Sequence, residues 1–390
     1  MSGRRLILVA SALIVAATVV AGATASTGAM TAGQGFKQVG KWGKVGTGNG
    51  QFGNAVFGLA TSKGGNVYAA DTGNDRVQVF SANGGFVDKF GTNGGGNGQF
   101  VSPYDVAVSP DGSVFVADYS NDRVQKFSGG GGFQQEIASS QPTGVGVDAD
   151  GNLYVASGGK VVRYDKASGF AQGASWGGAG NNGDLDTSPD GSIFVADNGG
   201  LRIVRFSSEG KQVGTIRGGL SAPIGIGVDH DCNVWVGNIS ARRIAKFSPG
   251  GKMLTTAASS DLIAQDIAVG RRGDVYAFDG SSRAIVRFAE DKAKPGTANV
   301  PGTITAKGRT AKITYTLSGV ACPAEIGATA TLTGPGISGK AAGLKLRAGA
   351  KNTIAMKLSK PGSGKATFKI VLQTNGRPTT ETRSVTVVSK

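Results

Sequence analysis

The sequence predicts an all-β protein in which a six-bladed β-propeller is followed by a small immunoglobulin-like β-sandwich. The first observation is a segment that occurs six times between residues 67 and 288, each copy reading as a strand, a polar turn and a second strand. The second is the spacing of 39 to 47 residues between copies, which is typical of one propeller blade per copy. The third is a change of composition after Glu290, where short alternating strands rich in Thr, Ala and Lys begin.

The N-terminus has the pattern of a targeting segment, so we expect an exported protein. Arg4 and Arg5 form a positive end, residues 6–20 are apolar, and residues 23–25 read Ala-Thr-Ala, as at a signal-peptide cleavage site. We therefore assign residues 1–25 to a signal peptide and expect an extracellular or cell-surface location. The alternative is an uncleaved membrane anchor. No second apolar run in the sequence is long enough to cross a bilayer.

Each copy fits a blade of four strands in a constant order, which the second blade illustrates best. Residues 103–108 are the expected inner strand, 114–118 the second, 123–127 the third and 133–137 the outer strand. The Asp111-Gly112 pair between the first two strands predicts a type I′ hairpin turn.

A strand that precedes every blade predicts how the ring closes. Residues 36–43 resemble the outer strand of the first blade, residues 86–91, and the last blade lacks such a strand after Phe288. We expect residues 36–43 to supply it, because this pairing leaves no open sheet edge. The expected boundaries are 36–290 for the propeller, 291–299 for a linker and 300–390 for the basic sandwich.

The repeated pattern resembles the NHL repeat. It contains a proline, an inner strand, Asp-Gly, the run V-x-V-A-D-x-x-N-x-R-[VI]-x-x-F, and then G-x-F and F-G. The resemblance implies a six-bladed propeller over residues 36–290 in a protein of the exported, bacterial type. It is strongest in the first two blades. It weakens later, where Ser157 and Asn238 replace the motif Asp and Ala284 replaces the motif Arg.

We assign the polar residues of the repeat to architecture rather than to catalysis. They recur around the ring, whereas an active site needs one asymmetric arrangement. We expect each Asp to bond the backbone of the turn and each Arg to pair locally. The clearest pairs are Asp71 with Arg76, Asp118 with Arg123, and Asp197 with Arg202.

Carboxylates that break the repeat point to the central channel. The third position of the inner strands alternates between glycine and aspartate around the ring: Gly58, Asp105, Gly144, Asp184, Gly225 and Asp266. Like charges at a channel repel one another unless a cation or a raised pKa relieves them. One hypothesis is a metal site, with Ca²⁺ as the candidate ion, formed by Asp105, Asp184, Asp186 and Asp266. The other is that these carboxylates bond backbone N–H groups and never meet.

The single histidine and the two cysteines limit other chemistry. His230 lies in an expected turn, and a zinc catalyst needs several His or Cys ligands. The resemblance extends to propeller lyases that use several histidines around the channel, which this chain does not have. We therefore name no catalytic residue, and no cofactor other than the candidate Ca²⁺. Cys232 and Cys322 could form a disulfide in an exported protein, with two separate thiols as the alternative.

Charge is distributed unevenly along the chain. Residues 26–290 contain 23 Lys and Arg against 23 Asp and Glu, whereas residues 291–390 contain 16 against 3. A basic domain attracts polyanions, which for an exported protein are wall polymers or lipid head groups. A solubilising surface is the alternative. We expect no nucleic-acid partner, because the propeller is neutral and the chain is exported.

These observations favour a non-enzymatic binding scaffold. The propeller would present a protein- or glycan-binding face, and residues 300–390 would dock to anionic polymers of the cell envelope. We expect a monomer with no membrane span after signal cleavage. The alternative is a metal-dependent hydrolase or lactonase that uses the channel carboxylates.

Overall fold

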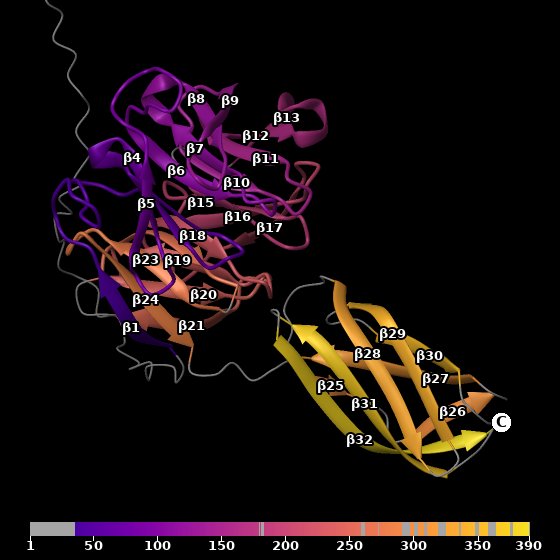
Figure 1. The fold of residues 1–390 in the computed structure, drawn as a ribbon. Helices are drawn as coiled ribbons and strands as arrows, with labels where there is room; N and C mark the ends of the chain where they lie inside the picture. Colours follow the sequence, from indigo (N-terminus) through magenta and orange to yellow (C-terminus); the bar gives the residue numbers. More distant parts are fainter. Residues whose placement is uncertain are drawn as a thin grey trace, which may run out of the picture. The chain divides into compact units, whose positions relative to one another are not determined.

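The computed structural model describes residues 36–178, 180, 183–258, 262–271 and 273–290, and beyond them the strands between residues 297 and 389. Six four-stranded antiparallel sheets form a six-bladed β-propeller (Figure 1). The expected signal peptide, residues 1–25, lies outside the described residues, as do residues 291–296 of the expected linker.

Every blade has an inner, a second, a third and an outer strand. The inner strands are β2 (Gly58–Thr61), β6 (Pro103–Val108), β10 (Gly144–Val147), β14 (Leu185–Thr187), β18 (Pro223–Val228) and β22 (Ala264–Val269). The second strands are β3 (Val67–Asp71), β7 (Val114–Asp118), β11 (Leu153–Ser157), β15 (Ile193–Asp197), β19 (Val234–Asn238) and β23 (Val275–Asp279). The third strands are β4 (Arg76–Phe80), β8 (Arg123–Phe127), β12 (Lys160–Asp165), β16 (Arg202–Phe206), β20 (Arg243–Phe247) and β24 (Ala284–Glu290). The outer strands are β5 (Phe86–Phe90), β9 (Phe133–Ala138), β13 (Ala171–Gly177), β17 (Gln212–Ile216), β21 (Met253–Ala258) and β1 (Phe36–Trp42). Three short 3₁₀ turns are η1 (Thr72–Asn74), η2 (Tyr119–Asn121) and η3 (Lys166–Ser168).

The core lies between neighbouring blades rather than within one sheet. Successive side chains of a strand point to opposite faces, so one strand contributes to two cores. In β7, Val114 and Val116 pack in a cluster with the first blade, while Phe115 and Ala117 pack in a cluster with the third. This is why the second strands are apolar on both faces and almost completely buried.

The N-terminal strand β1 belongs to the last blade. It pairs antiparallel with β24, from Phe36 opposite Glu290 to Trp42 opposite Ile285. Figure 1 shows the indigo β1 beside the orange β24, so the first and last strands of the propeller share one sheet. The Trp42 ring lies 6.3 Å from Phe80 of the first blade and 6.0 Å from Tyr276 of the sixth, measured between centroids.

The hairpin after the inner strand differs from the type I′ turn that we predicted. A type I′ turn needs positive φ at both central residues, but in the Asp111-Gly112 pair only Gly112 has it, at 89°. Ser109 N–H donates to Ser113 O over 2.8 Å, and Gly112 N–H donates to Ser109 O over 2.9 Å. The prediction is therefore wrong in type. The loop has three residues, and its glycine takes the left-handed position.

Beyond the propeller, eight strands pair in one sheet order, β25-β27-β26-β32-β31-β28-β29, with β30 beside β27. They are β25 (Thr297–Asn299), β26 (Thr303–Lys307), β27 (Thr310–Ser318), β28 (Glu325–Gly334), β29 (Ile337–Arg347), β30 (Lys351–Lys357), β31 (Gly364–Thr374) and β32 (Arg377–Ser389). The immunoglobulin-like sandwich stays a prediction for this part. Among the residues that the structure describes, no helix is both long and apolar enough to cross a bilayer.

Candidate functional site

A cavity of about 440 Å³ occupies the channel of the propeller. Its wall consists of the six inner strands and the turns that follow them, and all four predicted site residues, Asp105, Asp184, Asp186 and Asp266, lie on it. Each inner strand has a neighbour only on its outer side, so the backbone groups of its other edge face the channel. These groups need partners, because unpaired buried N–H groups are costly.

We define two rings of backbone N–H groups along this wall. The first ring comprises the N–H groups of Leu59, Val106, Val145, Leu185, Ile226 and Ile267. The second ring, two residues further along each strand, comprises those of Thr61, Val108, Val147, Thr187, Val228 and Val269. All twelve residues line the cavity.

At the first ring, three carboxylates each accept a hydrogen bond from an N–H group of the next blade. Asp105 accepts hydrogen bonds from its own neighbour Val106 and from Val145 of the third blade, both over 2.7 Å. Asp184 accepts from Ile226 of the fifth blade over 2.8 Å. Asp266 accepts from Leu59 of the first blade over 2.5 Å, and this bond closes the ring.

The glycines between these aspartates allow neighbouring strands to approach closely. A Cβ atom on Gly58 would lie 2.4 Å from Cα of Asp105, and one on Gly225 would lie 2.3 Å from Cα of Asp266. A Cβ atom on Gly144 would lie 3.1 Å from Cα of Asp184. The alternation therefore has a steric reason: an Asp on one blade reaches an N–H on the next, and the Gly on that blade lets the following strand come close.

The carboxyl groups of the first ring also act on one another. Burial raises the pKa of Asp105 and Asp266 well above the usual range, and the charge of Asp184 raises both further. Burial likewise raises the pKa of Asp184 to about 6 and that of Asp186 to about 7. The hypothesis of backbone bonding thus describes these residues, but its expectation that they never meet is wrong.

The metal hypothesis stays a prediction. In the described part of the chain, no group of three or more His, Cys, Asp or Glu residues is arranged to hold a metal ion. Asp266 is 1% exposed, and its carboxyl group shares a hydrogen bond with that of Asp184, which requires a proton on one of the two.

At the second ring, a carboxylate is present in one blade only. Asp186 accepts hydrogen bonds from Thr187 and from Val228 of the fifth blade, both over 2.7 Å. The cavity mouth carries His230 and the cations Lys63 and Arg271. Burial lowers the pKa of His230, and the charge of Arg271 lowers it further.

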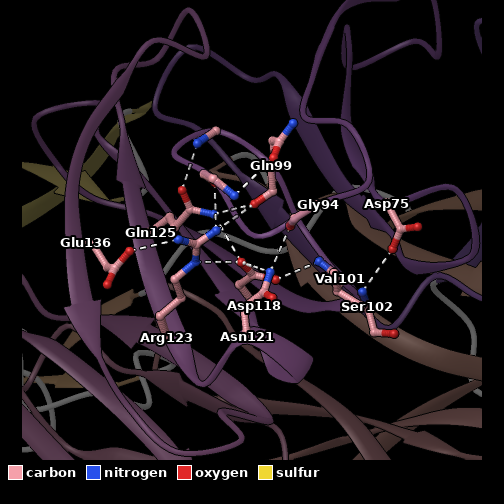
Figure 2. Close-up of polar contacts among 12 residues, drawn as sticks. Asp75, Gly94, Gln99, Val101, Ser102, Asp118, Asn121, Arg123, Gln125 and Glu136 are labelled. Atoms are coloured by element: carbon pink, nitrogen blue, oxygen red, sulfur yellow. Dashed lines mark hydrogen bonds and ion pairs between the residues drawn. The ribbon is translucent and has the colours of Figure 1, made fainter. Parts of the chain in front are cut away.

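In the second blade the repeat residues bind the linker that precedes the inner strand (Figure 2). Asp118 accepts from Arg123 Nε over 2.8 Å and from the Val101 N–H over 2.9 Å. Arg123 also donates to the backbone carbonyls of Gly96 and Gln99 and to the Glu136 carboxylate.

The first blade repeats this arrangement, because Asp71 pairs with Arg76 over 2.8 Å and accepts from the Gly53 N–H. In the fourth blade Asp197 pairs with Arg202 over 2.6 Å. Each Arg pairs locally. In the first two blades the carboxylate bonds the linker backbone instead of the turn backbone, whereas in the fourth blade Asp197 accepts from the Gly200 N–H of the turn over 2.9 Å.

Cys232 occupies the turn position that is usually glycine in the other blades. Its φ is 56°, its side chain is completely buried, and it is disulfide-bonded. Cys322 lies outside the described residues, so the Cys232–Cys322 pairing stays a prediction.

Sequence reasoning found the aspartates and offered backbone N–H groups as their partners, but it did not identify which residues donate. Almost every residue type has a backbone N–H group, so the sequence does not indicate which residues form the two rings. The alternation of Asp with Gly was the available signal, because only a close approach of the strands explains both residue types together. The cations of the mouth, Lys63 and Arg271, were also missed. Both lie in turns after inner strands, where a charged residue is ordinary.

Known proteins support the fold. The NHL repeat model matches residues 100–127. No curated protein sequence is significantly similar to this chain. A streptogramin B lyase structure is similar with a TM-score of 0.50 and 14% identity, covering 66% of this chain and 98% of that one. A structural genomics protein of unknown function from Bacteroides thetaiotaomicron has a TM-score of 0.51 and 17% identity, covering 66% of this chain and 76% of that one. At such identities the likeness concerns the fold alone, and the chain thus contains an NHL repeat within a six-bladed β-propeller.

Proposed function

We propose that this protein is an exported, non-enzymatic binding scaffold whose propeller holds a ligand at the channel cavity. The observation that carries this proposal is the hydrogen bonding of the cavity carboxylates. Asp105 and Asp186 each have both oxygens bonded to backbone N–H groups, so they maintain the wall of the cavity. A volume of about 440 Å³ is in the range of small-molecule sites.

The role of residues 300–390 in this proposal is to dock to anionic polymers of the cell envelope. The support is the charge of residues 291–390, with 16 Lys and Arg against 3 Asp and Glu. Binding of this kind weakens with salt, because it is driven by the release of counterions.

Co-sedimentation of the chain from residue 26 to 390 with purified envelope polymers tests the docking, over a series of salt concentrations. Exchange of Lys345, Lys357 and Lys369 for Glu should abolish sedimentation. The matched control is the exchange of three exposed propeller lysines, which should leave it unchanged: Lys44, Lys89 and Lys211. Equal loss in both variants would indicate that net charge alone is responsible, and the docking role would then be rejected.

A metal-dependent hydrolase or lactonase is the second candidate. The observation in its favour is that burial raises the pKa of Asp184 to about 6 and that of Asp186 to about 7, in the range where a general acid or base works at neutral pH. Lactone and ester substrates should be tried in EDTA and then with Ca²⁺. Turnover that Asp186→Asn removes would favour the enzyme over the scaffold. No turnover in any condition would reject it.

A further inference from the structure

We propose that the second ring of N–H groups binds a small dicarboxylate at the two places where the ring lacks an aspartate. This inference rests on the proposed binding function and names its ligand class. One place lies between the N–H groups of Val108 and Val147, and the other between those of Val269 and Thr61.

The hydrogen bonds of the neighbouring residues fix the direction of these N–H groups. In an antiparallel pair, residues bonded to the partner strand alternate with residues that face away from it. Ser109 N–H donates to Ser113 O over 2.8 Å, so Val108, one residue earlier, faces away from β7 and toward the channel. Equivalent bonds occur in the first, third and sixth blades, from Ser62 N–H to Asn66 O, from Asp148 N–H to Asn152 O and from Gly270 N–H to Asp274 O. They show that the N–H groups of Thr61, Val147 and Val269 face the channel in the same way.

Asp186 shows what such a pair of N–H groups accepts. Its carboxylate bridges Thr187 of its own strand and Val228 of the next blade, both over 2.7 Å. Asp105 bridges Val106 and Val145 with the same geometry in the first ring. The protein thus uses a carboxylate as the bridging group in both rings.

Alanine stands at the two corresponding positions of the second ring. In the first ring the aspartates belong to the second, fourth and sixth blades. Two residues further along, these blades have Ala107, Asp186 and Ala268. Both alanines line the cavity, and no described residue accepts from the N–H groups of Val108, Val147, Val269 or Thr61.

The chemistry favours an anionic acceptor over an apolar ligand. The four residues are half-buried on the cavity wall, so a ligand must compete with water for their N–H groups. Hydrogen bonds to a charged acceptor are stronger than those between neutral groups, so a carboxylate competes better than a neutral ligand does. Converging backbone N–H groups form anion-binding concavities in other folds. The lining contains Lys63 and Arg271 against Asp148, and burial raises the pKa of the four channel aspartates, which reduces their negative charge toward an anion. Because both places lie on the wall of one cavity, we assign them to one ligand with two carboxylates rather than to two separate anions.

Binding of succinate to the chain from residue 26 to 390 tests this inference, with the amide resonances followed by NMR. The resonances of Val108, Val147, Val269 and Thr61 should shift. Those of Thr187 and Val228 should shift less, because Asp186 already bonds both, so they serve as an internal control. Equal shifts in all six, or none at saturating succinate, would overturn the proposal.

Two further experiments test the charge of the ligand and the location of the site. Succinamide, a neutral molecule of similar size, should bind at least tenfold more weakly, and equal affinity would reject the carboxylate class. The Ala107→Asp and Ala268→Asp double variant should place protein carboxylates on the same N–H groups and reduce succinate affinity at least tenfold. Circular dichroism checks that this variant is folded, and full affinity in a folded variant would contradict the proposed location.

If succinate fails to bind while envelope polymers still bind, only this inference fails. If succinate binds and polymers do not, the docking role fails instead.

Discussion

Individual glycines at the channel determine how closely neighbouring inner strands approach. Gly225 lies against the backbone of Asp266, and a Cβ atom there would come within 2.3 Å of the Asp266 Cα. Backbone atoms in two sheets cannot move apart as freely as the end of a long side chain. Glycine is therefore required at this position by its neighbour rather than by its own dihedral angles.

We expect Gly225→Ala to lower the free energy of unfolding by about 3 kcal/mol, because overpacking against backbone forces the strands apart. Urea denaturation measures this difference. Gly177→Ala is the control, since a Cβ atom at Gly177 meets nothing within 4 Å and exposed substitutions change stability by less than about 0.5 kcal/mol. Similar losses in both variants would contradict the close-approach argument.

The cavity carboxylates predict how stability depends on pH. Burial raises the pKa of Asp184 to about 6 and that of Asp186 to about 7, both above the value of 3.8 expected when unfolded. Between pH 3.8 and about pH 7, the folded state therefore binds more protons than the unfolded state. The free energy of unfolding should fall as the pH rises from about 4 to about 8.

Urea denaturation at pH 5 and pH 8 measures this difference, and Asp186→Asn should reduce it because Asn does not titrate. The same difference in the variant and in the original chain would show that Asp186 is not a source of the pH dependence.

At the scale of elements, the Asp–Arg pair joins a blade to the linker before it. Arg123 has a side chain that is 6% exposed and donates to Asp118, Glu136 and two linker carbonyls. Arg202 in the fourth blade is 28% exposed and pairs with Asp197. We therefore expect the Arg of the motif to contribute more to the free energy of unfolding in the second blade than in the fourth.

Arg123→Lys should lower the free energy of unfolding by about 3 kcal/mol, because Lys lacks the planar fork and leaves a buried carboxylate with fewer donors. Arg202→Lys should cost less than about 1 kcal/mol, since its pair is more exposed to solvent. Chemical denaturation compares the two. Equal costs would show that burial does not set the strength of this pair.

At the scale of the whole molecule, β1 holds the ring closed. It covers the edge of β24, and Phe36 packs edge-on against Trp235 of the fifth blade with centroids 4.5 Å apart. Without β1, the backbone edge of β24 would be open to pairing with another chain.

A chain that begins at Gly43 should therefore unfold at a lower urea concentration and self-associate. Size-exclusion chromatography and denaturation measure the two effects. A chain that begins at Phe36 is the control and should behave as the longer chain does. If the shorter chain stays monomeric with an unchanged midpoint, β1 does not close the propeller in the way that the pairing indicates.

The prediction from sequence succeeded where the signal was local. Six blades and the order of strands followed from alternation, turn residues and a nearly regular spacing, and the NHL repeat followed from the resemblance of the repeated motif. The turn at Asp111-Gly112 was predicted with the wrong type, because Asp-Gly fits a two-residue and a three-residue loop equally well. The register of the whole hairpin decides between them.

The sequence by itself determined the propeller, since five blades are specified by residues close together in the chain and the outer strand of the sixth, β1, resembles that of the first blade. Only the tertiary structure decided what the channel aspartates do. Asp266 reaches the N–H of Leu59, 207 residues away, and Asp105 reaches that of Val145, 40 residues away. The identity of a bonded N–H group depends on how the ring closes and on the edge that each inner strand leaves free, and backbone groups are the same in every residue type that can occupy those positions.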